Sequence, residues 1–348
     1  MSDNPFTLTF GQEPNMLISR GAVGDQIVES FTGRYAMTHT YLIEGIRGSG
    51  KTVLMTTIAK KLEKEKEWIV INLNSTRNLL EDLADGLEYS VRQFPDIFKQ
   101  GMSVSVADFG FGVNGNGQPA NVIGRIEDIL RLLQKKEKRL LITIDEVALD
   151  DNMRIFASQF QIFLREDFPV FLIMTGLYEN LNSIQNDPQL TFLLRCPKAQ
   201  LQPLSISAVV REYQMAFDID EDTAKTLAHT TKGYAFAFQV LGYFTYKDDH
   251  HDYRKVITKY RLYLDEFVYE KLWSELSAKD REVIICMAQT GFETVSEIRA
   301  HTGMDSNEFS KYRLRLIRKG LVDGSMRGRL VFVLPLFSEF VLNQLEYM

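Results

Sequence analysis

A short run near the start of the chain has the residue types and spacing of a phosphate-binding loop. Gly45 to Thr52 follow the pattern G-x-x-x-x-G-K-[ST], in which glycines let successive backbone N–H groups point inward around a polyphosphate. A helix beginning near Lys51 would add the positive end of its dipole, and the Lys51 ammonium would reach the β- and γ-phosphates. The pattern predicts that a nucleoside triphosphate is bound by Gly45, Ile46, Arg47, Gly48, Ser49, Gly50, Lys51, Thr52 and Val53.

Two adjacent carboxylates follow an apolar run later in the chain. Leu-Leu-Ile-Thr-Ile at 140–144 is followed by Asp145 and Glu146. An apolar strand that ends in an acid places its carboxylate at the edge where parallel sheets bind their ligands. We expect Asp145 and the Thr52 hydroxyl to hold a Mg²⁺ ion, and Glu146 to polarise the attacking water. Together with the loop, this pair predicts hydrolysis of the nucleotide.

Two further residues match steps of phosphoryl transfer. Thr175 ends an apolar run and puts a small hydroxyl where a γ-phosphate sensor is expected, although Thr-Gly is also ordinary chemistry for the end of a strand. Arg195 could supply positive charge to the γ-phosphate of a neighbouring subunit, or be a surface arginine. The sequence contains no Asn-Lys-x-Asp tetrapeptide, which favours ATP over GTP.

Strands that alternate with helices are expected to position these residues. Apolar runs predict strands at 40–44, 68–73, 140–144, 170–174 and, in shorter form, 199–203. Periodic segments predict helices at about 22–33, 51–65, 75–94, 122–136 and 151–166. This order predicts an α/β fold, a three-layer αβα domain around a parallel sheet of the P-loop NTPase type. Alternation over 101–118 predicts an inserted hairpin, which could cover an edge strand or contact DNA or a neighbouring subunit; we favour the first.

The pattern changes after residue 203, where the ATPase domain (1–203) is expected to end. Short helices indicate a separate helical segment at 204–250; they are predicted at about 206–217, 220–230 and 235–244. The family resemblance described below implies that this segment is a helical lid. Helices at about 262–276, 278–288, 295–301 and 305–319, then strands at 321–322 and 329–333, indicate a winged helix-turn-helix domain at 251–348. Four apolar and aromatic residues of the last helix recur at helical spacing, which predicts that they pack in a core rather than stack on bases; they are Phe236, Phe238, Leu241 and Tyr243.

Positive charge is concentrated in the last of these domains. Between Asp305 and Leu330 seven basic residues accompany three acidic ones, in a chain whose net charge is −6. We expect one face of the helix there to turn to the core through Phe309, Leu314, Ile317 and Leu321. The basic face and the wing could hold duplex DNA through Lys311, Arg315, Arg318, Arg327 and Arg329. Basic residues are also common on solvated faces, and winged helices also dock proteins.

The overall composition is that of an ordinary globular chain. With 348 residues, 45% hydrophobic and 25% charged, two to three domains are expected. Cys196 and Cys286 lie far apart without metal-ligand spacing, which disfavours a disulfide framework and a zinc site. The first residues lack an export pattern and no apolar run approaches membrane-spanning length, so we expect a cytoplasmic protein without a membrane segment.

The order of these elements resembles the AAA+ ATPases, and within them the bacterial and archaeal ATPases similar to the origin-recognition class. The resemblance covers most of the chain, from Pro14-x-x-Leu-Ile-Ser-Arg20 through the loop, the Asp-Glu pair, Thr175-Gly176, Arg195 and a lid with Gly233 to the winged helix. It implies Arg20 near the adenine, Lys51 on the phosphates, Thr52 and Asp145 on magnesium, Glu146 as base and Thr175 as γ-phosphate sensor. Many AAA+ lids carry a sensor arginine, whereas residues 231–239 contain none. We therefore expect slow turnover, with Lys232 as the cation that could substitute.

Two functions of different classes fit these features. The first is an ATP-driven switch that self-associates with ATP, hydrolyses it slowly and in an assembly-dependent way, and binds duplex DNA through the winged helix. Replication, transposition and mobile-element maintenance would all fit this function. The second is a signalling or defence ATPase whose winged helix docks a protein partner. A small-molecule kinase is disfavoured by the Asp-Glu pair and the winged helix.

Overall fold

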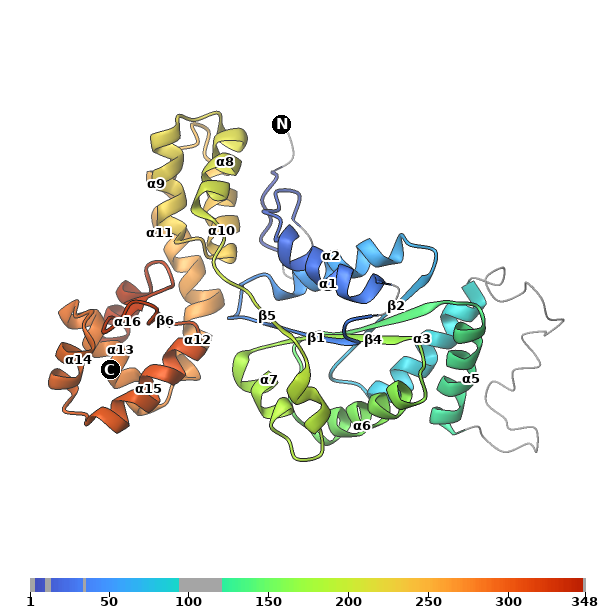
Figure 1. Cartoon of the computed structure of the whole chain (residues 1–348). Helices are drawn as coiled ribbons and strands as arrows, with labels where there is room; N and C mark the ends of the chain where they lie inside the picture. The colour runs from blue at the N-terminus through green and yellow to red at the C-terminus, as the bar shows by residue number, and fades with distance from the viewer. Residues whose placement is uncertain (1–3, 10–13, 34–35, 94–120, 347–348) are drawn as a thin grey trace. The chain divides into compact units, whose positions relative to one another are not determined.

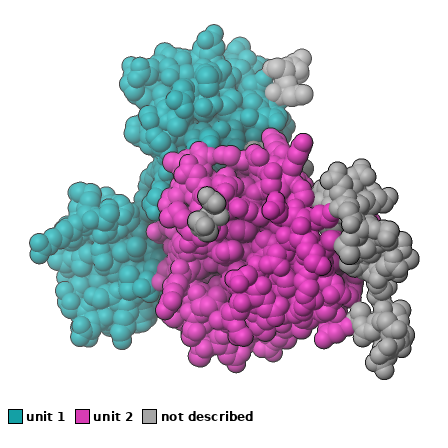
Figure 2. All heavy atoms as spheres, turned by 45° about the vertical axis from the view of Figure 1, so that its right-hand side comes forward, with its two compact units in different colours: residues 1–19, 45–50, 201–348 teal, residues 20–44, 51–200 magenta. Residues whose placement is uncertain are grey.

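The chain forms two compact units, which the computed structural model describes over residues 4–9, 14–33, 36–93 and 121–346 (Figure 1, Figure 2). Unit 1 contains residues 1–19, 45–50 and 201–348, and unit 2 contains residues 20–44 and 51–200. The hairpin predicted at 101–118 lies outside the described residues. Within the described ranges, no helix is long and apolar enough to cross a membrane.

A parallel sheet forms the centre of unit 2. Its strands in the described residues are β1 (Thr40–Glu44), β2 (Trp68–Leu73), β3 (Arg139–Ile144), β4 (Val170–Gly176) and β5 (Lys198–Gln200). They lie in the order β2-β3-β4-β1-β5, and every neighbouring pair is parallel. β1 and β4 are buried along their whole length, as expected for apolar strands covered on both faces. Parallel pairing brings the carboxyl ends of β1, β3 and β4 to one edge of the sheet.

Helices cover both faces of this sheet. They are α1 (Gly21–Thr32), α2 (Lys51–Glu63), α3 (Leu79–Gln93), α5 (Val122–Lys135), α6 (Asp151–Arg165) and α7 (Tyr178–Gln185). Figure 1 shows α1 and α2 on one face and α3, α5, α6 and α7 on the other. Phe156, Phe160 and Phe163 of α6 are completely buried in the core with Leu172 of β4, and each contributes about 2–3 kcal/mol. The three-layer αβα fold predicted from the sequence is confirmed.

The α8–α10 segment of unit 1 consists of α8 (Ile206–Phe217), α9 (Glu221–Thr231) and α10 (Ala235–Lys247). Phe236, Phe238 and Leu241 are buried, as predicted, and Tyr243 is half-buried. The N-terminal part of the chain packs here through Phe6, whose ring lies 5.4 Å from that of Phe238. A Cβ at position 242 would lie 2.4 Å from the Phe6 ring, so Gly242 is what allows this approach.

A long interrupted helix leads from this segment into the C-terminal region. α11 (Tyr253–Leu264) continues through a π-helical turn (Asp265–Tyr269) into α12 (Glu270–Ser274). The C-terminal region then contains α13 (Ala278–Thr290), α14 (Val295–Thr302), α15 (Ser306–Arg318), β6 (Val322–Asp323), β7 (Val331–Phe332) and α16 (Phe337–Glu346). The helix expected from about 262 begins at Tyr253 because α11 packs against α10. β6 and β7 pair antiparallel.

The buried face of α15 differs from the sequence prediction. Leu314, expected in the core, is 44% exposed, whereas Leu316 is completely buried. Leu316 lies two helical turns after the buried Phe309 and therefore on the same face, while Leu314 points well away from it. The exposed residues of α15 are Ser306, Asn307, Ser310, Lys311, Leu314 and Arg318.

Candidate nucleotide site

The predicted phosphate loop is a tight turn followed directly by a helix. The Ser49 N–H donates to the Ile46 carbonyl at 3.2 Å, and Gly48 and Gly50 have φ values of 72° and 92°, which favour glycine. α2 begins at Lys51, so the positive end of its dipole lies at the end of the loop. The loop contains Gly45, Ile46, Arg47, Gly48, Ser49 and Gly50, and the first turn of α2 contains Lys51, Thr52 and Val53.

Two predicted residues of unit 2, one from α2 and one from β4, donate hydrogen bonds to Asp145, which directly follows β3. The Thr52 hydroxyl of α2 donates to Asp145 Oδ2 at 2.6 Å, and the Thr175 hydroxyl of β4 donates to Asp145 Oδ1. Thr175 is completely buried and Asp145 is half-buried. Hydroxyl and carboxylate oxygens are the ligands that Mg²⁺ prefers. In the described residues no group of three or more His, Cys, Asp or Glu could hold a metal, so a cation here would rely on one carboxylate, hydroxyls, water and phosphate.

Glu146 occupies a strained position next to this cluster. Its φ is 50°, in the left-handed region that costs a non-glycine residue about 1 kcal/mol or more. The Glu146 N–H donates to Asp145 Oδ1 at 3.0 Å and to the Thr175 hydroxyl at 3.3 Å. These bonds hold the backbone in this turn and leave the Glu146 side chain exposed.

A buried acid that was not predicted from the sequence lies directly before the phosphate loop. Glu44, the last residue of β1, is 6% exposed, and its Oε2 has no hydrogen-bond partner within the described residues. Lys198 of β5 lies 3.8 Å away, and burial raises the pKa of the Glu44 carboxyl although Lys198 opposes this. The signal in the sequence is a glutamate at the end of an otherwise apolar strand.

Arg195 and Arg20 lie elsewhere in unit 2, each at the end of a helix. Arg195 ends a 3₁₀ helix (Thr191–Arg195) just before β5 and is exposed. Arg20 directly precedes α1, and its carbonyl accepts the N–H groups of Val23 and Gly24. Burial lowers the pKa of the Arg20 guanidinium.

A residue that the sequence did not predict, Tyr234, contacts the phosphate loop within unit 1. The Tyr234 hydroxyl donates to the Arg47 carbonyl at 2.6 Å, and the Phe236 N–H donates to the Gly48 carbonyl at 3.1 Å. Lys232, the cation considered as a substitute for a sensor arginine, donates to the Phe332 carbonyl of β7 at 3.1 Å. The side chain of this turn that donates a hydrogen bond to the loop is thus that of Tyr234, two positions further along the chain.

The basic residues of the C-terminal region do not all face solvent. Arg315 pairs with Asp280, which is 1% exposed, at 2.7 Å and donates to the Ser277 hydroxyl, also at 2.7 Å. Arg329 forms an ion pair with Glu293. The exposed members of the predicted set are Lys311, Arg318, Arg327 and Arg329.

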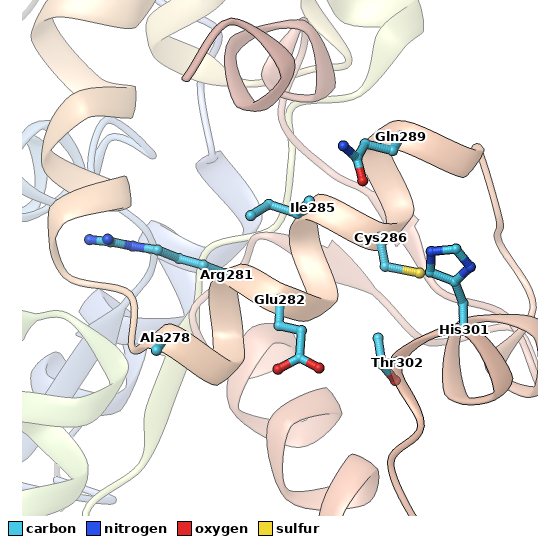
Figure 3. Close-up of a pocket in the computed structure, with 8 residues that line it drawn as sticks. All are labelled: Ala278, Arg281, Glu282, Ile285, Cys286, Gln289, His301 and Thr302. Carbon is cyan, nitrogen blue, oxygen red and sulfur yellow. The ribbon is translucent and has the colours of Figure 1, made fainter. Parts of the chain in front are cut away.

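A hollow of about 420 Å³ lies in the C-terminal region rather than at the residues predicted to bind nucleotide. α13 and the end of α14 line it, and Figure 3 shows Glu282, Cys286 and His301 around it. Cys286 is buried, which raises the pKa of its thiol. None of the residues predicted from the sequence to bind nucleotide, metal or DNA lines this hollow.

Comparison with family models gives one match to part of the chain. The model described as "Domain of unknown function (DUF8462)" matches residues 266–341, from the π-helical turn into α16. No curated protein matches the sequence.

Among the solved structures that are similar to the chain, two match it over almost its whole length with TM-scores of 0.60 or more. The Walker-type ATPase PABY2304 of Pyrococcus abyssi has a TM-score of 0.66 and 14% identity, covering 94% of this chain and 96% of that one. The ORC2 protein of Aeropyrum pernix, in its ADPNP-ADP complexes, has a TM-score of 0.60 and 15% identity, covering 97% of each chain. At identities of 14% and 15%, the comparison shows similarity of fold.

Proposed function

We propose that this chain, which has the fold of the origin-recognition-like AAA+ ATPases, is an ATP-hydrolysing switch that binds duplex DNA. The observation that carries the nucleotide part of the proposal is that the hydroxyls of Thr52 and Thr175 both donate to Asp145, and that Thr52 directly follows the lysine of the phosphate loop. Phosphoryl transfer needs a hydroxyl and a carboxylate that hold the metal ion beside the phosphate loop, and Thr52 with Asp145 would supply both.

The roles of the nucleotide residues follow from their chemistry. Lys51 would bind the β- and γ-phosphates, and Thr52 with Asp145 would hold Mg²⁺. When bound, the ion would neutralise phosphate charge. Glu146, held exposed by its strained backbone, would accept the proton of the attacking water, and Thr175 would sense the γ-phosphate. Arg20 is proposed at the adenine, and the exposed Arg195 at the nucleotide of a neighbouring subunit in an ATP-dependent assembly.

The DNA part of the proposal rests on the C-terminal region, which we interpret as a winged helix within residues 251–348, after a lid at 204–250. Helix α15 would enter the major groove, and the β6–β7 turn would be the wing. Lys311, Arg318 and Arg327 would contact phosphates because they are exposed. Arg315 would act indirectly by holding α15 on α13 through Asp280.

A second candidate function, docking of a protein partner by this region, is favoured by two exposed apolar side chains. Leu314 on α15 is 44% exposed and Met326 in the β6–β7 turn is 56% exposed. Apolar side chains at such positions are typical of protein interfaces, whereas phosphate contacts are polar.

Phosphate release and DNA affinity test the proposed function together. The purified chain should release phosphate slowly from ATP, only with Mg²⁺, and its affinity for duplex DNA should fall steeply with salt concentration. Absence of nucleotide binding would end the first part of the proposal. Nucleotide hydrolysis together with salt-independent or absent DNA binding would favour the protein-docking function.

A further inference from the structure

Tyr234 contacts the phosphate loop from the turn that joins α9 to α10. Its hydroxyl donates to the Arg47 carbonyl at 2.6 Å. The Phe236 N–H, in the first turn of α10, donates to the carbonyl of the next loop residue, Gly48, at 3.1 Å. Two consecutive loop peptides are therefore held by one short stretch of unit 1.

The turn fixes the Tyr234 side chain in a single place. Gly233 before it has a φ of 72°, and its carbonyl accepts the Leu204 N–H at 2.7 Å. The Tyr234 N–H donates to the Thr231 carbonyl at 2.9 Å, and the residue is 4% exposed. Burial raises the pKa of the Tyr234 phenol, so the group remains a neutral donor at any physiological pH.

The loop is shaped to receive this residue. A Cβ at position 48 would lie 2.2 Å from the Tyr234 hydroxyl and 2.9 Å from the Phe236 Cβ. Gly48 is therefore required for the close approach of Tyr234 as well as for its φ of 72°.

Fixing a carbonyl also fixes the neighbouring N–H. A trans peptide is planar, so the Gly48 N–H points opposite to the Arg47 carbonyl that Tyr234 holds. In the same way, the Phe236 bond fixes the peptide that carries the Ser49 N–H. Phosphate binding by a loop of this kind depends on the direction of such N–H groups.

We propose that Tyr234 is a positioning residue for nucleotide binding, because its hydroxyl sets the direction of the Gly48 N–H in the phosphate loop. This inference rests on the proposed ATP binding. It gives the α8–α10 segment a role in nucleotide binding that does not require a sensor arginine. A loop with this peptide already oriented avoids the cost of ordering it when the nucleotide arrives.

The test compares Tyr234→Phe with Tyr213→Phe in the full chain. The Tyr213 hydroxyl of α8 is also buried and donates to a carbonyl, that of Phe238, at 2.8 Å, so each variant loses one hydrogen bond of the same kind. Both variants should lower Tm by a similar amount without nucleotide. Only Tyr234→Phe should weaken ATP and ADP binding, by about fivefold to tenfold in calorimetric titration, and raise KM while leaving kcat near that of the unmodified chain.

Amide hydrogen exchange of the nucleotide-free chain provides a second measurement that does not depend on activity. Peptides covering residues 45–50 should exchange faster in Tyr234→Phe than in Tyr213→Phe. Equal nucleotide affinities in the two variants and the unmodified chain would overturn the inference, and so would tighter binding by Tyr234→Phe. If the unmodified chain and Lys51→Ala bind nucleotide equally poorly, the proposed function itself fails.

Discussion

The cluster at Asp145 and the basic C-terminal region compensate their charges in different ways. Both oxygens of the Asp145 carboxylate accept hydrogen bonds from hydroxyl groups, which are neutral. Arg315, by contrast, is paired with the buried carboxylate of Asp280, and Arg329 with Glu293. The first region orders an anion without cancelling its charge, whereas the second cancels part of the positive charge that it carries.

This difference concerns which charged groups remain available to a ligand and which support the fold. A carboxylate held by hydroxyls keeps its negative charge for a cation, because the hydroxyls can turn to other acceptors when the cation arrives. An arginine paired with a buried acid cannot leave it for a phosphate without exposing an unpaired charge in the interior. We therefore expect large functional effects around Asp145, and in the C-terminal region functional effects only at the exposed cations.

The largest effect is expected from Lys51→Ala, which removes the cation of the phosphate loop. ATP affinity should fall more than a hundredfold, because the β- and γ-phosphates lose their charged partner. Lys61→Ala is the matched control, since Lys61 lies on the same helix and pairs with Asp25 at the surface. Calorimetric titration with ATP and Mg²⁺ measures the effect. ATP binding retained by Lys51→Ala would remove the basis for assigning a ligand to this region.

Glu146→Gln should separate binding from hydrolysis. ATP should bind with unchanged affinity, while phosphate release should fall by about a hundredfold or more, because the amide cannot accept the proton of the attacking water. Glu137→Gln is the control, since Glu137 is also exposed and also has a positive φ, 53°. A hydrolysis rate equal to that of the control would assign the base to another residue.

The two regions also differ in how far the sequence predicts them. The strands around Asp145 and the meeting of Thr52 with Asp145 could be predicted because apolar strands of a parallel sheet end at one edge, whatever the details of packing. The buried face of α15 could not be predicted, because either Leu314 or Leu316 could turn to the core. The packing of α15 against α13 determines which of them is buried. The pairing of Arg315 with Asp280 depends on that same choice of face.

Contacts between distant parts of the sequence could not be predicted for a different reason. Tyr234 lies 187 residues after Arg47, and no local pattern relates a turn between two helices to a loop so far away. The fold could be predicted from periodicity, yet α7 and α16 were missed because they are short and follow turn-rich stretches.

A moderate effect is expected in the C-terminal region from the double variant Lys311→Ala/Arg318→Ala. Both side chains are exposed on α15, so duplex DNA affinity should fall by about tenfold at low salt, and the salt slope should decrease by about two. The Tm should stay unchanged. Fluorescence anisotropy over a series of salt concentrations measures this, and an unchanged slope would favour protein docking.

Arg315→Ala provides the contrasting variant within the same helix. Removing it leaves the Asp280 carboxylate buried without its guanidinium partner, which should destabilise the chain by about 2 kcal/mol. DNA binding at a temperature well below Tm should keep the salt slope of the unmodified chain. A decrease in slope without loss of Tm would show that Arg315 contacts phosphate and would end the proposed separation of the two roles.

The smallest effect concerns Asp265, in the π-helical turn between α11 and α12. Burial raises the pKa of its carboxyl from 3.8 to about 6, with Arg261 opposing and Glu270 and Glu339 adding to the shift. Because the pKa of this carboxyl is higher in the folded than in the unfolded chain, its protonation adds to the free energy of unfolding. This contribution is complete below about pH 4 and is lost as pH rises through about 6.

Asp265→Asn stays neutral, so it should exceed the stability of the unmodified chain above pH 6 by about 1 kcal/mol, a value reduced for the partial exposure of the group. Below pH 4 the two chains should be equally stable. Glu266→Gln, at an exposed position in the same turn, is the control and should leave the pH dependence unchanged. Chemical denaturation at about pH 3 and at about pH 7.5, on either side of the range between 3.8 and about 6, measures the difference. If Asp265→Asn is no more stable than the unmodified chain at pH 7.5, this carboxylate has a charged partner in solution, and the turn then compensates its charge as the Arg315 pair does.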